Sequence, residues 1–191
     1  MPIAETELHY DSPFHLLIAV ILSAQCTDKR VNMTTPAIFE AYPDAGTLAN
    51  ASYEDLFQLV RSISYPNNKT RHLIGMAQKL VTDFGGVVPS DIDELMSLPG
   101  VGRKTANLVC GDIYGRPAVV ADTHFIRLCR RMGFTDTSDP LKIEKEMRAL
   151  LPPDKSNNFC HRAVIHGRSV CTARKAHCES CCLNAVCNKN I

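Results

Sequence analysis

Apolar residues recur at helical spacing along most of this chain. The apolar positions in residues 56–63, and again in residues 73–81, fall on one face of a helix. Intervals of three or four residues between apolar positions indicate an amphipathic helix, whereas a half-buried strand alternates every second residue. Such alternation is absent, and only the Val119–Val120 pair suggests a short extended segment. The pattern therefore predicts an all-α protein.

Residues that begin and end helices mark the expected boundaries. Ser12 before Pro13 predicts an N-cap with proline at the first helical position. Asp28 and Ser90 are candidate caps of later helices, and Gly85–Gly86 predicts a helix end. The expected helices span residues 13–22, 28–39, 52–63, 70–84, 90–98, 105–114, 122–132, 140–150 and 156–166.

The composition is that of an ordinary globular protein. Hydrophobic residues make up 45% of the 191 residues and charged residues 21%, which suits one domain or two small lobes. The apolar run at residues 15–24 is too short to span a bilayer, and no basic segment precedes it as in a secretory signal. We therefore expect a cytoplasmic protein, associated with the nucleoid if the source is bacterial.

The charge is unevenly distributed, although the net charge is only +1. Residues 1–60 contain two Lys or Arg and eight Asp or Glu, whereas residues 61–131 contain ten against six and residues 155–191 six against one. Two basic segments in a nearly neutral chain suggest a local surface for a polyanion such as nucleic acid. The alternative is a solvated surface on which like charges cluster by chance.

Four of the nine cysteines follow the spacing Cys171-x6-Cys178-x2-Cys181-x5-Cys187. Four thiolates on one short loop can enclose a metal centre, and both an iron–sulfur cluster and a structural zinc ion use such a set. Zinc modules usually combine two close pairs of cysteines, and only one close pair is present here. We therefore favour the iron–sulfur cluster. The adjacent Cys182 is either a spare thiol or an alternative ligand.

The other four cysteines are scattered through apolar or mixed stretches. An odd total without a signal peptide argues against a disulfide framework. Burial as small apolar residues is the usual fate of free cysteines. We therefore predict core thiols at Cys26, Cys110, Cys129 and Cys160.

The stretch Leu98-Pro-Gly-Val-Gly-Arg-Lys-Thr105 separates two expected helices. Gly100 and Gly102 permit positive φ, and they let backbone N–H groups approach a partner closely. Those N–H groups lie at a helix N-terminus, where an anion such as phosphate is favoured. The alternative is a plain helix–helix turn. The stretch is not a nucleotide-binding loop, because the spacing that such a loop requires and the strand that precedes it are both missing.

Two side chains near this turn are candidates for chemistry. Lys104 falls in the first turn of the second helix, where the helix dipole disfavours a cation. Such a lysine can act as an amine nucleophile and form a Schiff base, or it can simply contact phosphate or solvent. Asp122 starts the next helix, where Asp is most often an N-cap, but it can also accept a proton or stabilise a cation.

Taken together, these features resemble the endonuclease III family of helix–hairpin–helix DNA glycosylases, over nearly the whole chain. The hairpin, the aspartate segment and the cysteine spacing all match that family, and their combination is far more specific than any one of them. The matching segments are Leu98-Pro-Gly-Val-Gly-Arg-Lys-Thr-Ala-Asn107, Ala121-Asp-Thr-His124, the four cysteines, His166-Gly-Arg168 and Leu22-Ser-Ala-Gln25.

The resemblance implies an all-α fold of two lobes. Residues 12–115 would form a helical barrel that carries the helix–hairpin–helix at residues 91–114, and residues 116–191 would form the iron–sulfur cluster lobe. DNA would lie across the cleft between the lobes, with Lys104 and Asp122 facing each other. The four cysteines of the spacing would hold one structural 4Fe-4S cluster.

The implied activity is that of a bifunctional DNA N-glycosylase and abasic-site lyase in base excision repair. Lys104 would displace an oxidised pyrimidine from its sugar and form a Schiff base, and β-elimination would cut the strand. Asp122 would deprotonate the lysine or stabilise positive charge on the sugar. The alternatives are a monofunctional glycosylase of the same superfamily and a DNA-binding module without catalysis.

The resemblance also implies a set of contacts to damaged double-stranded DNA. Gln25 matches a position that fills the gap left by the flipped base. Tyr65 stands where the family usually has a leucine wedge, and a tyrosine can still stack between bases. The expected DNA-binding residues are Gln25, Tyr65, Gly100, Val101, Gly102, Arg103, Arg168, Arg174 and Lys175.

The front of the chain departs from the family pattern. Relatives usually begin with a further helix that packs on the cluster lobe, and this chain starts at about the segment that follows it. We hypothesise that Met1 is an internal methionine and that an extended form would have the higher thermal midpoint. No heptad pattern or large apolar stripe stands out, so we expect a monomer.

Overall fold

The computed structural model describes residues 6–191, so the question raised at Met1 lies outside the described residues. The described chain divides into two compact units, here called the N-terminal unit (residues 7–109) and the C-terminal unit (residues 110–191, with which Thr6 is grouped). Within residues 6–191 the regular structure is helical, apart from one isolated antiparallel bridge between Cys171 and Ala176. The all-α prediction is therefore confirmed. No helix in the same range is long and apolar enough to cross a membrane.

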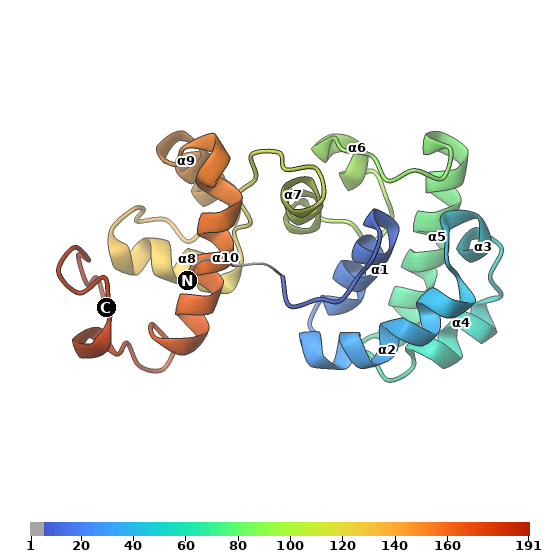
Figure 1. Cartoon of the computed structure of the whole chain (residues 1–191), viewed down its shortest axis with the longest axis horizontal. Coiled ribbons are helices and arrows are strands. Elements are labelled where there is room, and N and C mark those ends of the chain that lie inside the picture. The colour runs from blue at the N-terminus through green and yellow to red at the C-terminus, as the bar shows by residue number, and fades with distance from the viewer. Residues whose placement is uncertain (1–5) are drawn as a thin grey trace. The chain divides into compact units, whose positions relative to one another are not determined.

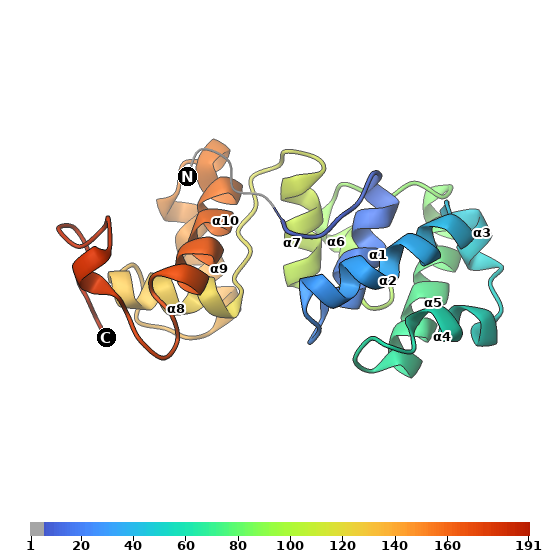
Figure 2. The same ribbon diagram turned by 60° about the horizontal axis from the view of Figure 1, so that its bottom comes forward.

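The N-terminal unit is built around a helix that is buried on all sides. Every residue from Phe14 to Leu22 in this helix, α1, is buried, which explains why its sequence is a continuous apolar run rather than a stripe. Helices α2 and α5 pack against α1, while α3 and α4 pack against α5 (Figures 1 and 2). The helices of this unit are α1 (Pro13–Ser23), α2 (Asp28–Ala41), α3 (Ala45–Ala49), α4 (Tyr53–Val60), α5 (Pro66–Phe84) and α6 (Ile92–Met96), followed by the start of α7 (Arg103–Asp112).

The sequence pattern missed or misplaced some boundaries in this unit. Helix α3 was not expected, because it has only one turn and a half and contains Gly46. Helix α5 begins at Pro66 rather than at residue 70. Proline lacks an N–H group and has a fixed φ, so it suits the first helical position, and this signal could have been used.

Two of the predicted N-caps are wrong by one residue. Helix α2 is capped by Thr27, whose hydroxyl accepts the Arg30 N–H, and not by Asp28. Helix α6 is capped by Asp91 and not by Ser90. Each segment has two adjacent residues that can act as an N-cap. The cap is the residue with extended backbone whose side-chain oxygen can accept a backbone N–H of the first turn.

Beyond the end of α7, the C-terminal unit consists of three long helices and an irregular C-terminal loop. Helix α8 packs against α10, and the ring of Phe159 meets Phe125 and Phe134 edge-on. The non-helical segment before α8 is held by α10, since the Ala118 N–H donates to Ser156 Oγ (3.2 Å). The helices are α8 (Thr123–Met132), α9 (Pro140–Leu150) and α10 (Pro153–Ser169), and a short 3-10 turn (Cys178–Ser180) follows in the loop.

Helix α7 belongs to both units, because the division between them falls at residues 109 and 110 inside this helix. The sequence placed the change of lobe after residue 115, and that boundary stays a prediction. Three of the four predicted core thiols, Cys110, Cys129 and Cys160, are buried. The prediction is wrong for Cys26, which is only half-buried because it lies in the turn after α1.

Candidate active site and cluster site

The hairpin between α6 and α7 is a tight turn with one obligatory glycine. Gly100 has φ +80°, and a Cβ atom there would lie 2.8 Å from Cβ of His72, so both backbone conformation and space demand glycine. Gly102, in contrast, does not have positive φ. Gly102 has open space where a Cβ would be. This leaves room for a partner to approach the backbone.

The Val101 side chain between these glycines is buried (7% exposed). The backbone N–H of Val101 donates to Leu98 O at 3.1 Å. Val101 therefore fixes the turn to the core, and the residues that follow it present their backbone at the start of α7. The first turn of α7 contains no acidic side chain, which keeps this helix N-terminus favourable for an anion.

Lys104 is exposed and lies in the first turn of α7. Asn107, one turn later, donates from Nδ2 to Arg103 O (3.2 Å) and is itself buried. The lysine is thus carried on a helix start that is anchored by the buried valine before it and the buried asparagine after it. Its amine is available to a molecule that approaches the hairpin.

Asp122 is the N-cap of α8. Its Oδ1 accepts the Phe125 N–H at 2.7 Å, and its own N–H donates to Val120 O at 2.9 Å. The predicted capping role is confirmed. The carboxylate is therefore held in one orientation at the start of a helix, which is what a group that must act at a fixed point requires. Lys104 belongs to the N-terminal unit and Asp122 to the C-terminal unit.

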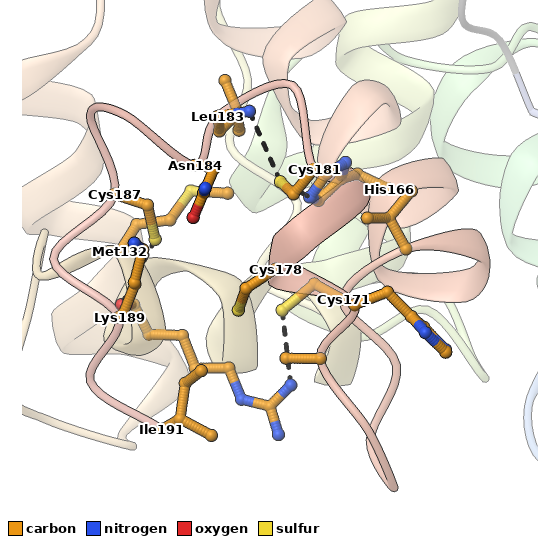
Figure 3. Close-up of a pocket in the computed structure, with 14 residues that line it drawn as sticks. Met132, His166, Cys171, Cys178, Cys181, Leu183, Asn184, Cys187, Lys189 and Ile191 are labelled. Carbon is orange, nitrogen blue, oxygen red and sulfur yellow. Dashed lines mark hydrogen bonds between the residues drawn. The ribbon is translucent and has the colours of Figure 1, made fainter.

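The four cysteines of the predicted ligand set line one pocket in the C-terminal unit (Figure 3). His166 from α10 and Arg131 from α8 line the same pocket. The structure therefore brings together all four side chains that the spacing singled out. Cys182 does not line this pocket and is exposed.

Several groups around this pocket contact the cysteine sulfurs. Arg131 Nη1 donates to Cys171 Sγ (3.3 Å), and the Leu183 N–H donates to Cys181 Sγ (3.4 Å). His166 Nε2 lies 3.6 Å from the same Cys181 sulfur. Burial lowers the pKa of His166, so the ring favours its neutral form. Donors around the sulfurs stabilise thiolates, the form in which cysteine binds metals.

The lining of this pocket can be compared with the two metal centres considered above. Within residues 6–191, no three Cys, His, Asp or Glu side chains converge as they would around one metal ion. A zinc ion requires four sulfurs about 2.3 Å from a single point. An iron–sulfur cluster is larger, and its thiolates are spread around several irons. The four thiols that line this pocket supply the kind of ligand that either centre uses.

Two arginines on α8 hold the loop that carries the cysteines. Arg127 Nη2 donates to Gly167 O (2.9 Å) and Cys171 O (3.1 Å), and Arg131 Nη1 donates to Thr172 O (2.8 Å). Sequence analysis did not single out this pair. Its only signal was the spacing of four residues, which puts both side chains on one face of α8.

The basic residues Arg174 and Lys175 lie at the exposed tip of a short turn. The bridge between Cys171 and Ala176 closes this turn. Thr172 locks it, since its Oγ1 donates to Lys175 O (2.8 Å) and accepts the Lys175 N–H (3.1 Å). Two cations are thus presented to solvent directly beside the first cysteine of the pocket.

Gln25 and Tyr65 are exposed and share an uncommon backbone conformation. Gln25 follows α1 with φ +54°, and Tyr65 precedes α5 with φ +57°. The Tyr65 side chain is 62% exposed. Positive φ in residues other than glycine stores strain, and such strain often marks a functional position. Both residues belong to the N-terminal unit.

Comparison with known proteins shows the family to which this chain belongs. Residues 18–153 match the family model of the HhH-GPD superfamily base excision DNA repair protein. The chain is 44% identical over 187 residues to endonuclease III of Synechocystis sp., which covers 97% of this chain and 85% of the relative. The chain therefore belongs to the HhH-GPD superfamily of base excision DNA repair proteins. Within that superfamily it belongs to the endonuclease III family.

Two solved structures are similar along nearly the full chain. One is described as a non-covalent endonuclease III–DNA complex, with a TM-score of 0.91, 42% identity and coverage of 98% of this chain and 88% of that chain. The other is described as a trapped endonuclease III–DNA covalent intermediate, with a TM-score of 0.92, 42% identity and coverage of 98% and 89%.

Proposed function

We propose that this protein is a bifunctional DNA N-glycosylase and abasic-site lyase that acts in base excision repair and removes oxidised pyrimidines. The observation that carries the proposal is Lys104, an exposed amine in the first turn of the helix that follows the glycine hairpin. A similar protein has been trapped in a covalent complex with DNA, which requires a nucleophile. An amine at a DNA-facing hairpin supplies one.

In the proposed reaction, the damaged nucleotide first leaves the helical stack, because its glycosidic bond is otherwise out of reach. Lys104 Nζ attacks C1′ of the sugar, a C–N bond forms, and the glycosidic bond breaks as the base departs. The opened sugar and the lysine then form a Schiff base. Loss of a C2′ proton and of the 3′-phosphate completes β-elimination and cuts the strand.

Asp122 has the second role in this proposal. A carboxylate fixed by the Phe125 N–H can accept the proton that Lys104 must lose before it attacks, or it can stabilise positive charge on the sugar. Both roles require a carboxylate with one defined orientation. The N-cap geometry provides that orientation, because the helix start and the side chain are locked together.

The proposed DNA contacts use backbone at the hairpin and side chains elsewhere. Gly100, Gly102 and Arg103 would offer N–H groups to a phosphate at the start of α7, with buried Val101 holding the turn in place. Gln25 and Tyr65 would fill the space left by the extruded nucleotide. The exposed cations would contact backbone phosphates, which positions DNA without reading sequence. These cations are Arg168, Arg174 and Lys175.

We also propose that Cys171, Cys178, Cys181 and Cys187 hold one 4Fe-4S cluster. When bound, such a cluster would act structurally, by closing the loop that presents Arg174 and Lys175. The support is the shared pocket of the four cysteines and the donors from Arg131 and Leu183 that meet two of the sulfurs. The protein would work as a monomer on damaged duplex DNA in the cytoplasm.

Borohydride trapping tests the proposed reaction directly. The protein is mixed with duplex DNA that contains one thymine glycol, and reductant is added to convert an imine into a stable covalent bond. We expect a covalent protein–DNA band from the parent chain. Lys104→Gln should give no band, because the amide cannot form an imine, while binding to damaged DNA persists. Lys142→Gln is the matched control, since Lys142 is an exposed lysine on α9 and should trap normally.

Other outcomes would exclude the proposal in identifiable ways. Base release without a band or strand cleavage by the parent chain would indicate a monofunctional glycosylase. DNA binding with neither base release nor cleavage would indicate a binding module. A band that survives in Lys104→Gln would show that another amine is the nucleophile.

A further inference from the structure

Lys69 is a buried lysine that the proposed chemistry does not use. It lies one turn into α5 with only 5% of its surface exposed. Its Nζ donates to Leu22 O and Ala24 O, both at 2.7 Å. Lysine is almost never buried without partners, so the two carbonyls account for its presence. They also define where its charge acts.

These two carbonyls lie at the end of α1. The last carbonyls of a helix have no partner within the helix, and they carry the negative end of its dipole. Helix α1 has no basic residue in its own last turn. The ammonium group of Lys69 fills that role from another helix. In doing so it fixes the backbone at Ala24, directly before Gln25.

The same residue is tied to the turn before α5. The Lys69 backbone N–H donates to Tyr65 O (3.2 Å). Two neighbouring bonds hold the start of α5: Thr70 Oγ1 donates to Pro66 O (2.8 Å), and the Tyr53 hydroxyl donates to Asn67 Oδ1 (2.7 Å). Lys69 therefore contacts two turns. Its side chain contacts the turn after α1 that contains Gln25, here called the Gln25 turn, and its backbone contacts the turn before α5 that contains Tyr65, here called the Tyr65 turn.

Both turns contain a strained residue. Among residues 6–191, only three residues other than glycine have positive φ: Gln25, Tyr65 and Lys189. Such a conformation persists only where the surrounding structure imposes it. Lys69 touches two of the three segments. Its bonds reach the peptide groups beside both strained residues, through Ala24 O directly before Gln25 and through Tyr65 O.

We propose that Lys69 is a positioning residue that joins the Gln25 turn and the Tyr65 turn into one rigid element for extruding the damaged nucleotide. This inference rests on the proposed function, since it assumes that both side chains enter the duplex. Filling the gap in a stack with two side chains costs ordering entropy unless they are already placed. Burial lowers the pKa of Lys69, whereas the electrostatic interaction with Cys26 raises that pKa.

The test separates extrusion from the later chemistry. Single-turnover base release from thymine glycol requires a stacked nucleotide to be extruded, whereas strand cleavage at a preformed abasic site needs far less unstacking. Lys69→Met keeps the apolar stem and removes the charge. We expect base release to slow about tenfold, because small misplacements of positioning groups have effects of this size or larger. Cleavage at the abasic site should change about twofold or less.

Two controls remove a general loss of stability as the explanation. Lys79→Met makes the same change further along α5, where Lys79 pairs with Asp83 and contacts neither turn, and it should leave both rates unchanged. In a Gln25→Ala, Tyr65→Ala background, Lys69→Met should cause no further loss of base release, because it acts through these two residues. If Lys69→Met does not fold, Lys69→Gln, which keeps an N–H donor, is measured instead.

A spectroscopic measurement reports on the two turns themselves. In a duplex with 2-aminopurine opposite an uncleavable abasic analogue, the parent chain should unstack the probe and raise its fluorescence. Lys69→Met at saturating concentration should give a smaller rise. The inference is overturned if both rates fall equally, or if base release and fluorescence both stay normal. A parent chain that releases no base would instead overturn the proposed function.

Discussion

At the scale of single residues, Asp122 combines a structural and a proposed chemical role. As the N-cap of α8 it accepts one N–H, and it is also the proposed partner of Lys104 in catalysis. The two roles need different properties. Capping requires an oxygen acceptor of the right length, and an asparagine satisfies it as well as an aspartate. Accepting a proton or stabilising a cation requires the negative charge.

Substitution at Asp122 should therefore separate stability from activity. Asp122→Asn is expected to keep the free energy of unfolding within about 0.5 kcal/mol of the parent, whereas Asp122→Ala should lose about 1 kcal/mol. Both should lower single-turnover base release by about 100-fold or more. Denaturant unfolding and rate measurements on the same samples check this. A fully active Asp122→Asn would remove the carboxylate from the mechanism.

The buried cysteines allow a second prediction at this scale. Burial raises the pKa of Cys129 and of Cys160 to about 12, so their thiolates form only well above neutral pH. At pH 8 the thiolate fraction is on the order of one in ten thousand, and alkylation needs the thiolate. Iodoacetamide followed by mass spectrometry should label exposed Cys182 and leave Cys129 and Cys160 unmodified. Rapid labelling of the latter pair in native protein would contradict their burial.

How far each residue could be predicted depends on the distance along the chain to its partners. Asp122 was identifiable because its acceptor role involves Phe125, three residues away. Lys69 and Arg131 were not identified, because their partners Leu22 and Cys171 are 47 and 40 residues away. A sequence shows local periodicity and caps, but it does not show which loop a folded helix will meet.

At the scale of elements, the two glycines of the hairpin have different roles. Gly100 has positive φ and leaves no space for a Cβ beside His72, whereas Gly102 has neither constraint.

Local sequence signals were enough to predict the hairpin and the long amphipathic helices. They failed at α3, because one turn and a half gives too few positions for a helical period to appear.

Alanine at each of these glycines should act on a different property. Gly100→Ala is expected to destabilise the protein by about 1 kcal/mol or more, because alanine is strained at positive φ and its Cβ would meet His72. Gly102→Ala should leave the thermal midpoint nearly unchanged and weaken DNA binding, because its methyl group fills the space open to a phosphate. Thermal unfolding and binding to an uncleavable abasic duplex check the pair. Equal midpoints for the two variants would contradict the prediction.

At the scale of the whole molecule, the two units obtain their stability in different ways. The N-terminal unit has a continuous core around α1. The C-terminal loop beyond α10 contains one bridge and one 3-10 turn, and Arg127 and Arg131 tie it to α8. A segment with so little regular structure should depend on the proposed cluster for stability, because metal binding energy is then folding energy.

Removal of iron should therefore affect the two units unequally. We expect the purified protein to contain iron and sulfide and to absorb light at about 400 nm. Chelation after reduction should abolish that absorption and lower the thermal midpoint. Limited proteolysis should then cut first between residues 171 and 191, with the N-terminal unit still protected. Colourless protein that contains zinc, or iron loss without new cleavage, would contradict the assignment.

The course of α7 has a practical consequence for dividing this protein. Because the two compact units meet along the chain inside a helix, a break between residues 109 and 110 would divide α7 unequally between the fragments and leave backbone groups unpaired. Fragments intended to reassemble should instead be separated at Gly115, which is exposed, has φ +59° and has nothing within 4 Å of its Cβ position. A reconstituted pair divided there keeps α7 whole, with Lys104 and the helix that carries it on a single piece.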